Sequence, residues 1–369
     1  MPSPKLLDHF SALKDPRQSW KTVYPLQEIL LVVLAGVMAG ADDFVEIACW
    51  AKRKLNFLRQ FLPFENGIPS HDTLNDVMNA LPNDLFTECF TAWVTALRGE
   101  DEDIVAIDGK TSRRAHGADG RPLHLVSAWA ARQRLVLGQE PCDEKENEIS
   151  AIPRLLKRLE LNGALVTIDA MGCQHGIAET ILAQGADYLL ALKANQKSLH
   201  AEVALFFQDT TGLVTHDTTD ADHGRIEKRR AWVCHDVDWL CGDRAEPGLH
   251  RFPGLACIGA VQAEVEHKGQ ITIARRYFLS SAPLSAAQLL RAARAHWGIE
   301  NRLHWVMDVV YHDDLMRLRT QNGPAKMAVI RHTSMNIFKG ISGKSSMKVR
   351  RKTAAWDDEY LAAAIRGAL

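Results

Sequence analysis

Two aspartates that each follow a strand-like run are the residues of this chain best suited to chemistry. Asp108 follows Ile104–Ile107, and Asp169 follows Leu165–Ile168. Short runs rich in Ile, Val and Leu are typical of strands buried on both faces. A carboxylate at the end of a buried strand is costly to desolvate, so it is most often there for a partner such as a cation. Either aspartate alone would more often form a turn, but the repeated arrangement predicts a metal site that handles phosphate.

Glu300 offers a third carboxylate, on a predicted helix. That helix opens with a Ser-x-x-Gln capping box at 285–288 and is expected to run to about residue 309. His296 and His304 lie one turn before and after Glu300 and share its face. Three carboxylates favour hard ions, Mg²⁺ or Mn²⁺, and two such ions about 3.5–4 Å apart can stabilise both oxygens of a phosphoryl displacement. The alternative is Zn²⁺ on the two histidines and the glutamate, which would leave both aspartates without a role.

Basic side chains near these acids predict contacts with phosphates. Lys110, Arg113 and Arg114 follow the first aspartate, and Lys193 and Lys197 follow the fifth predicted strand. Arg225 and Arg229 lie on one face of a later predicted strand. Further candidates surround the helical glutamate: His296, Asn301 and Arg302. Such contacts position a nucleic acid without reading its sequence, and solvated loop charge is the alternative for each residue. Gly109 is expected to permit a turn before the first basic cluster.

Composition places the chain among ordinary globular proteins. Its 369 residues are 46% hydrophobic and 24% charged, enough for two or three domains, and the net charge of −1 excludes a global basic field. Seven scattered cysteines form no Cys-x-x-Cys pair, which favours reduced thiols in a cytosolic protein.

The apolar run Ile29–Ala41 is shorter than the roughly 18 residues of a membrane span, so we expect a buried helix. There is no P-loop and no Gly-x-Ser-x-Gly motif.

Helical spacing dominates residues 1–98. The predicted helices are Leu26–Met38, Phe44–Phe61, Ser70–Leu81 and Asn83–Leu97. They could form a helix-turn-helix that reads DNA, or a plain bundle that packs on the rest of the chain.

The order of elements after residue 103 is that of a mixed α/β domain. The predicted strands and helices are Ile104–Asp108, Leu123–Ala130, Leu135–Gln139, the helix Ile149–Leu161, Leu165–Asp169, the helix His175–Ala183 and Tyr188–Leu192. A β-rich insertion is expected next, with strands at Ile226–Cys234, Leu255–Val265 and Ile271–Leu279. Near the end, Gly340–Lys352 is expected to be flexible and basic, either a DNA tether or simply solvated, through Lys344, Lys348, Arg350, Arg351 and Lys352.

Ordered motifs along nearly the whole chain carry a family resemblance. The first half contains Glu65-Asn66-Gly67-Ile68-Pro69, His71-Asp72-Thr73, Ala106-Ile107-Asp108-Gly109-Lys110-Thr111 and Glu144-Lys145-Glu146-Asn147-Glu148-Ile149. The second half contains Thr167–Gln174, Gly185–Leu189, Lys193–Gln196, His223-Gly224-Arg225-Ile226-Glu227 and His296-Trp297-Gly298-Ile299-Glu300-Asn301-Arg302-Leu303-His304-Trp305. With these motifs the chain resembles the DDE transposases of bacterial insertion sequences, specifically the H-repeat-associated group.

The resemblance implies an α/β fold, namely a ribonuclease-H-like mixed sheet with a β-rich insertion, preceded by an all-α N-terminal domain. With the element pattern it implies a helical domain at 1–98, a catalytic domain at 99–196 and 283–340, the insertion at 197–282 and a basic tail at 341–369. Asp108, Asp169 and Glu300 would be the catalytic residues and would hold two Mg²⁺ or Mn²⁺ ions. The implied activity is binding of terminal inverted repeats, DNA cleavage and strand transfer into target DNA. A homodimer in the synaptic complex, no membrane and the bacterial cytoplasm and nucleoid are the implied setting.

The sequence departs from the wider clan around its glutamate. The clan's Tyr-x2-Arg-x3-Glu-x6-Lys pattern falls here on Ala293, His296, Glu300 and Met307, so its Arg and Lys contacts with DNA do not carry over. Glu146 also replaces the serine of the Glu-Lys-Ser-Asn-Glu motif. The alternative functions are a metal-dependent nuclease without strand transfer and an inactive or domesticated DNA-binding protein.

Overall fold

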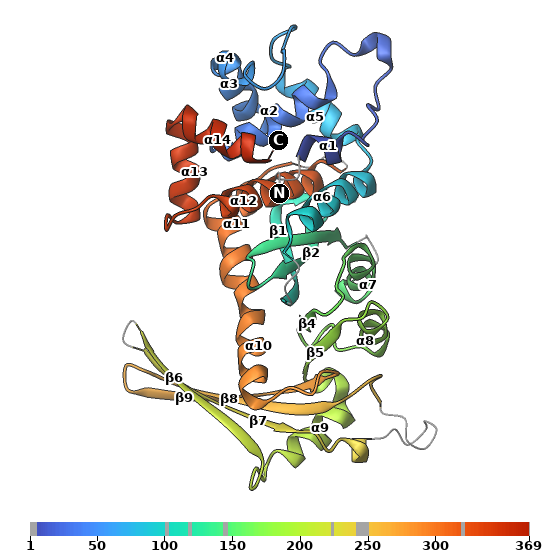
Figure 1. Cartoon of the computed structure of the whole chain (residues 1–369), viewed down its shortest axis with the longest axis vertical. Helices are drawn as coiled ribbons and strands as arrows, with labels where there is room; N and C mark the ends of the chain where they lie inside the picture. Colours follow the sequence, from blue (N-terminus) through green and yellow to red (C-terminus); the bar gives the residue numbers. More distant parts are fainter. Residues whose placement is uncertain are drawn as a thin grey trace.

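The computed structural model describes residues 6–99, 103–116, 120–142, 147–222, 225–240, 251–318 and 322–368. The molecule is elongated (Figure 1). Helices from both ends of the sequence gather at one end, a sheet with flanking helices forms the middle, and long strands form the other end. Residues 144–146 and 223–224 of the family motifs, Glu146 included, lie outside the described ranges.

The N-terminal part is helical, as the sequence predicts. Its helices are α1 (Leu6–Phe10), α2 (Leu26–Met38), α3 (Phe44–Arg53), α4 (Leu55–Leu58), α5 (His71–Ala80) and α6 (Asn83–Leu97). The predicted bounds of α2 and α6 are confirmed, and the Ser70 side chain caps α5 by accepting a hydrogen bond from the Thr73 N–H. The predicted helix Phe44–Phe61 is instead broken at Lys54. Among the described residues, no helix is both long and apolar enough to cross a membrane.

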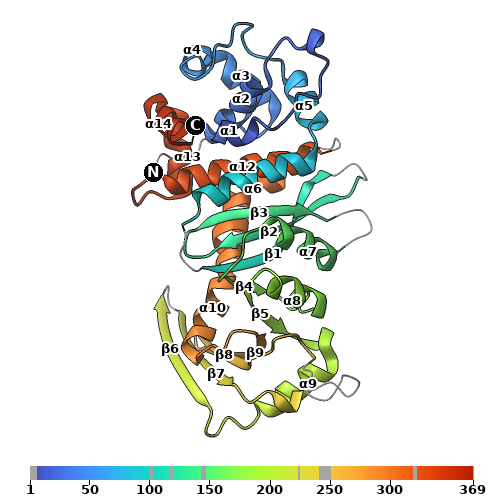
Figure 2. The same ribbon diagram turned by 45° about the vertical axis from the view of Figure 1, so that its right-hand side comes forward.

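The central sheet has the strand order of the ribonuclease-H-like fold. Its strands are β1 (Ile104–His116), β2 (Pro122–Ala130), β3 (Leu135–Pro141), β4 (Leu165–Ile168) and β5 (Asp187–Leu192), in the order β3-β2-β1-β4-β5. The first three strands pair antiparallel, whereas β4 runs parallel to both β1 and β5. Helices α7 (Glu148–Arg158) and α8 (His175–Leu182) lie along one side of this sheet (Figure 2). The predicted fold class is therefore confirmed.

Strand β1 does not turn after Asp108, contrary to the sequence prediction. It continues to His116, and Gly109 pairs with Val126 of β2. A Cβ at Gly109 would lie 2.1 Å from the Oε1 atom of Glu148 and 2.8 Å from the Nε2 atom of His124. Glycine fits here because α7 brings the Glu148 carboxylate against the strand backbone, so the constraint is steric rather than conformational.

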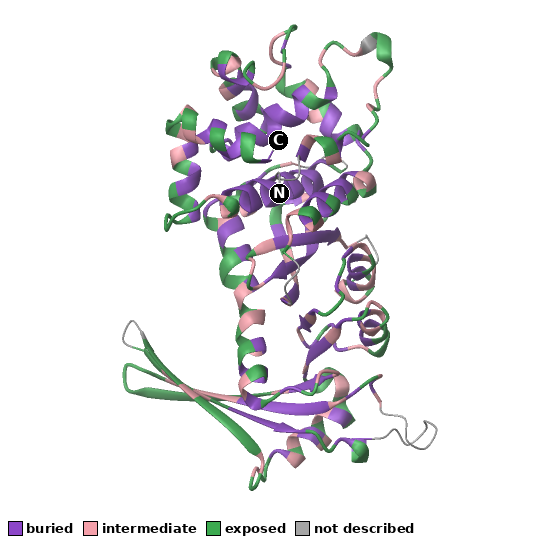
Figure 3. Ribbon diagram, in the orientation of Figure 1, coloured by how far each residue is buried: buried purple, intermediate pink, exposed green. Residues whose placement is uncertain are grey.

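The insertion extends the central sheet rather than standing apart from it. It contains α9 (Lys197–Phe206), β6 (Val214–Asp222), β7 (Arg225–Cys234), β8 (Cys257–His267) and β9 (Gln270–Ser280). Strands β6 to β9 pair antiparallel, and β9 pairs with β5 from Tyr277 to Ser280, so the nine strands form one sheet. The outer halves of these strands are exposed (Figure 3). The sequence predicted β7, β8 and β9 but missed α9 and β6.

One long helical rod crosses the sheet on the side away from α7 and α8. It consists of α10 (Ala286–Ile299), a π-helical segment (Glu300–His304) and α11 (Trp305–Val309). Both hydrogen bonds of the capping box between Ser285 and Gln288 are present, which confirms the predicted start of the helix. The rod ends at Val309, which confirms the predicted end. The π-helical segment was not predicted. It is a single wide turn, of the kind often found at functional sites.

The C-terminal residues are not a flexible basic tail. They form α12 (Gly323–Gly340), α13 (Met347–Trp356) and α14 (Asp358–Ala368), which pack against the N-terminal helices. Arg350 and Arg351 are buried and donate hydrogen bonds to backbone carbonyls. The prediction failed because a guanidinium group carries five donors and can satisfy several carbonyls at once, which a count of basic residues does not reveal. Lys344, Lys348 and Lys352 are exposed.

Candidate functional site

Strand pairing brings the two predicted aspartates side by side. The parallel register of β1 and β4 ends with Ile107 opposite Ile168, and Asp108 and Asp169 are the next residues of the two strands. The Oδ1 atom of Asp169 accepts hydrogen bonds from the N–H groups of Met171 (2.9 Å) and Gly172 (3.3 Å). This local turn fixes the carboxylate at the carboxyl edge of parallel strands, where ligands of α/β proteins collect.

The long helical rod brings Glu300 to the same edge. The Nδ1 atom of His304 lies 3.0 Å from Oε2 of Glu300 and 3.6 Å from Oδ2 of Asp108. One ligand atom from each of these three residues lies within 4.8 Å of the others, which is close enough for them to hold one cation. Glu300 is more exposed than Asp108, with 58% of its side chain accessible against 26%. The open side of the site is therefore the helix side.

The electrostatics at Asp108 are those of a crowded acidic site. Burial, together with the negative charges of Glu148, Asp169 and Glu300, raises the pKa of Asp108 from 3.8 to about 7, although the Gly109 N–H acts in the opposite direction. Because like charges resist joint ionisation, a cation at this position would relieve their repulsion. The residues therefore fit a divalent metal ion by both donor chemistry and charge.

The two histidines of the rod have different surroundings. The Nδ1 atom of His296 lies 3.1 Å from the Thr167 hydroxyl, whereas His304 faces the carboxylates of Glu300 and Asp108. Burial lowers the pKa of both imidazoles, which favours their neutral form. The group of candidate ligands around Glu300 consists of Asp108, Glu300 and His304. It leaves out His296 of the predicted zinc alternative, and it also leaves out Asp169 of the predicted carboxylate set.

Lys110 is held by acids that the sequence did not connect with it. Its Nζ atom lies 2.7 Å from Asp308, 3.3 Å from Asp313 and 3.4 Å from Asp314, and only 14% of its side chain is accessible. A phosphate would have to compete with three carboxylates for this ammonium group. Spacing could not reveal this, since the acids are about two hundred residues away in the chain.

The other predicted basic residues of the strand ends are exposed. Arg113 forms an ion pair with Asp314 at 3.3 Å but keeps 83% of its side chain accessible, and Arg114, Lys193 and Lys197 are exposed as well. Lys193 lines a pocket of about 140 Å³ together with Asp169 and His296. These side chains are free to meet a ligand that approaches the acidic edge.

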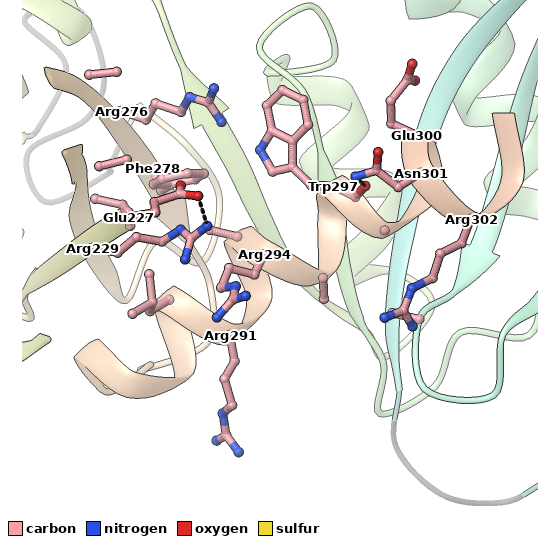
Figure 4. Close-up of a pocket in the computed structure, with 18 of the residues that line it drawn as sticks. Glu227, Arg229, Arg276, Phe278, Arg291, Arg294, Trp297, Glu300, Asn301 and Arg302 are labelled. Atoms are coloured by element: carbon pink, nitrogen blue, oxygen red, sulfur yellow. Dashed lines mark hydrogen bonds and ion pairs between the residues drawn. The ribbon is translucent and has the colours of Figure 1, made fainter. Parts of the chain in front are cut away.

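A cleft of about 980 Å³ opens between α10 and the strands β7, β8 and β9, and Glu300 lies at its edge (Figure 4). Arginines line it from both sides: Arg225, Arg229 and Arg276 from the strands, and Arg291, Arg294 and Arg302 from the rod. Asn301 and Trp297 also line it, and the Arg276 guanidinium lies 4.6 Å from the Trp297 ring centre. Glu227 and Asp220 form ion pairs with some of these arginines.

The sequence identified part of this cleft. Arg225, Glu227 and Arg229 share one strand face, as their alternation predicted, and Asn301 and Arg302 also line the cleft. Arg276, Arg291 and Arg294 were missed. Only the pairing of β8 with β9 and the crossing of the rod place them opposite the predicted arginines.

A second group beside Asp108 was also missed. The Thr111 hydroxyl lies 2.7 Å from Nδ1 of His124, and Nε2 of the same ring lies 2.8 Å from Oε1 of Glu148. Glu148 belongs to a family motif, but its position against β1 depends on where α7 packs. No spacing signal in the sequence connects it with Asp108.

Comparisons with known proteins agree on one family. The model of the DDE_Tnp_1-associated domain matches residues 7–94, and that of the transposase DDE domain matches residues 99–337. The chain is 38% identical to the "H repeat-associated putative transposase YhhI" of Escherichia coli K12, over 98% of both chains. It is 35% identical to the "Putative transposase YncI" of Escherichia coli O157:H7, over 96% of this chain and 93% of that one. A piggyBac transposase synaptic complex with hairpin DNA shows a TM-score of 0.44 and 11% identity, over 97% of this chain and 76% of that one.

Proposed function

The chain belongs to the family of transposases with a DDE domain, and on that basis we propose that it cuts DNA at the ends of an insertion sequence and joins the cut ends to a target. The proposed substrates are terminal inverted repeats and a target duplex. Water is the nucleophile of cleavage, which breaks the bond between phosphorus and the 3′ oxygen. The freed 3′-hydroxyl then attacks a phosphorus atom of the target and forms a new phosphodiester bond. The bond between that phosphorus and the target's 3′ oxygen breaks, so the cut target strand leaves with a 3′-hydroxyl. No covalent intermediate with the protein is required.

The observation that supports this most is the convergence of Asp108, Asp169 and Glu300. Their carboxylates come from two adjacent strands and the rod, and the latter two charges contribute to the raised pKa of Asp108. We propose that these three residues bind divalent metal ions, either Mg²⁺ or Mn²⁺. The full complex with DNA would contain two such ions. When bound, such ions stabilise charge on the attacking and leaving oxygens.

The cleft supplies the proposed contacts with the DNA backbone. Six arginines and Glu300 line the same cleft, so a strand that follows the cleft would meet the acidic residues. Arg302 and Asn301 lie next to that glutamate, and Arg113, Arg114, Lys193, Lys197 and His296 would extend the contacts along the sheet edge. Such contacts fix register and orientation. Simultaneous handling of two ends requires at least two copies of the chain, so we propose a homodimer in the synaptic complex.

Cleavage of DNA that carries the cognate ends tests the proposal. With Mg²⁺, Asp108→Asn should lower the cleavage rate by roughly 10³-fold, the loss expected when several kcal/mol of transition-state stabilisation is removed. Asp209→Asn makes the same chemical change at an exposed position away from the site and should cleave normally. Cleavage by Asp108→Asn at the wild-type rate would refute the metal-site assignment.

A labelled target plasmid separates transposition from simple hydrolysis. The proposal predicts that end fragments with a free 3′-hydroxyl become covalently joined to the target. Cleavage without any joined product would identify a metal-dependent nuclease instead. Binding to the ends without cleavage would identify an inactive DNA-binding protein.

A further inference from the structure

His304 connects the acidic site with the interior of the protein. Its side chain is buried at the π-helical segment of the rod, and its Nδ1 atom faces Oε2 of Glu300 at 3.0 Å. An ionised carboxylate only accepts hydrogen bonds, so the Nδ1 atom must carry the hydrogen. In a neutral imidazole with that tautomer, Nε2 keeps a lone pair and needs a donor.

The His304 side chain also lines a small cavity on the inner side of the rod. The cavity has a volume of about 10 Å³, and its walls include His304, His332, Ser127, Ser112 and Lys110. This volume corresponds to the space of one water molecule. His332 comes from α12, so the cavity lies between the rod, the central sheet and α12.

Two buried nitrogens at this cavity have no hydrogen-bond partner among the described residues. They are Nε2 of His304, a residue that is 5% exposed, and Nδ1 of His332, which is 4% exposed. Buried polar atoms are almost always hydrogen-bonded, either to protein or to ordered water. A single water that bridges the two rings would satisfy both atoms, since it offers two donors and two acceptors.

We propose that His304 is a positioning residue for Glu300: its Nδ1–H orients the glutamate carboxylate, and a buried water shared with His332 holds its Nε2 side. The inference rests on the proposed function, because it gives Glu300 the role of a metal ligand. Outer partners of this kind fix the direction of a ligand's lone pairs before the metal arrives. Glu300 needs such support more than Asp108 does, because its side chain is mostly exposed and would otherwise be free to rotate.

The rival assignment makes His304 itself a metal ligand through Nδ1. The ring would then lose its Nδ1 hydrogen and donate to the cavity through Nε2–H. The two assignments therefore differ in which nitrogen carries the hydrogen, and a spectrum of the ring nitrogens separates them. The amide nitrogen of asparagine takes the place of Nδ1, and that of glutamine takes the place of Nε2.

Mn²⁺ binding, measured by calorimetry on the full chain without DNA, is the first test. His304→Asn keeps a donor toward Glu300 and should bind Mn²⁺ within about threefold of the wild type. His304→Gln loses that donor and should bind about 10–100-fold more weakly, as is typical for the loss of an outer partner. Equal losses in both variants would overturn the inference, since a role in packing alone would affect them alike.

Glu300→Gln in the same experiment separates failure of the inference from failure of the proposed function. If Glu300→Gln binds Mn²⁺ like the wild type, Glu300 is not a ligand and the proposed function loses its site. If Glu300→Gln loses binding but His304→Gln does not, the site stands and His304 has no positioning role.

The position of the hydrogen on the ring can also be observed directly in the wild-type protein. In a two-bond ¹H–¹⁵N spectrum of the histidine rings, His304 should appear neutral with the hydrogen on Nδ1. His332→Leu, which removes one partner of the water, should shift the Nε2 signal of His304 and leave Nδ1 protonated. A hydrogen on Nε2 in the wild type, or no response to His332→Leu, would refute the tautomer or the shared water.

Discussion

At the scale of single residues, Asp108 is where stability and the proposed function oppose each other. Its raised pKa of about 7 means that the folded protein binds a proton more tightly there than the unfolded chain does, with its ordinary value of 3.8. The stability that depends on this proton is present below pH 3.8 and is lost as the pH rises through 7. Crowding of the acids therefore destabilises the metal-free protein at neutral pH.

Asp108→Asn should thus make the metal-free protein more stable. We expect a gain of about 1–3 kcal/mol at pH 8 in urea unfolding, which shrinks as the pH falls toward 4 because Asp108 of the wild type then becomes protonated. Added Mg²⁺ should stabilise the wild type and not the variant. A variant that is less stable than the wild type at pH 8 would show that Asp108 is not repelled by its neighbours.

Gly109 is a second residue for which the structure makes a specific prediction. Gly109→Ala should destabilise the protein by about 1–3 kcal/mol, since the new methyl group would overlap the Glu148 carboxylate. Gly176→Ala, at a helical position with open space, should be neutral or stabilising. Thermal unfolding measures both.

Glu148→Ala offers the internal control for this prediction. In that background the Gly109→Ala change should cost less, because the nearest obstacle is gone, although His124 still lies close. Equal costs in both backgrounds would show that Gly109 is required for another reason. From the sequence, Gly109 was expected to permit a local turn. In the structure the constraint on this position comes from Glu148 of α7.

At the scale of elements, prediction from sequence succeeded where one apolar pattern decides. Helices α2 and α6 and the start of α10 follow from apolar spacing and caps, so their bounds are confirmed. Strand β6 was missed because its sequence is polar and lacks an apolar pattern. It lies at the edge of the sheet and is defined only by its pairing with β7. The C-terminal helix α13 was missed because its many basic residues suggested a solvated segment, whereas Arg350 and Arg351 are buried.

Arg351 tests the corrected C-terminal structure. Its guanidinium group donates to the carbonyls of Val37 and Ala41 and forms an ion pair with Asp42 at 2.8 Å. Arg351→Ala should therefore destabilise the protein by about 3–5 kcal/mol, as expected when a buried charge pair loses one partner. Lys348→Ala, one turn away and exposed, should change stability by less than about 0.5 kcal/mol in the same chemical unfolding. Equal effects would restore the idea of a solvated tail.

At the scale of the whole molecule, the fold was predictable but the links between its parts were not. Alternation of strands and helices, with the family resemblance, gave the mixed sheet and its insertion. Asp313 shows what remained hidden: it accepts a hydrogen bond from Ser112 of β1 and forms ion pairs with Lys110 and with Arg331 of α12. This buried network joins β1 to the helical end of the molecule.

The acid sensitivity of the folded protein should reflect this network. The positive charges of Arg331 and Lys110 hold the pKa of Asp313 below its ordinary value of 3.8. The stability it contributes is therefore present above pH 3.8 and is lost as the pH falls through the lowered value. Asp313→Asn should be less stable than the wild type at pH 7, and the difference should shrink below pH 3.8. A difference that stays constant down to pH 2 would contradict this.

The proposed affinity for DNA is another property of the whole molecule, because the net charge is only −1 and six arginines line one cleft. A log–log plot of DNA binding against salt should have a clearly negative slope, and Arg302→Gln should reduce its magnitude by about 1. A slope near zero would refute the proposal that the arginines of the cleft contact DNA phosphates. Arg53→Gln, at an exposed position of α3, controls for a change of net charge alone.

The central claim is that Asp108, Asp169 and Glu300 act as one metal site on DNA. The most direct measurement is the Mg²⁺-dependent cleavage rate of end-bearing DNA by Asp108→Asn, Asp169→Asn, Glu300→Gln and each pair of these changes. Groups that act as a unit are strongly non-additive, so each single change should lower the rate nearly as far as any pair does. Wild-type cleavage in any single variant, or losses that simply multiply in the pairs, would contradict the account.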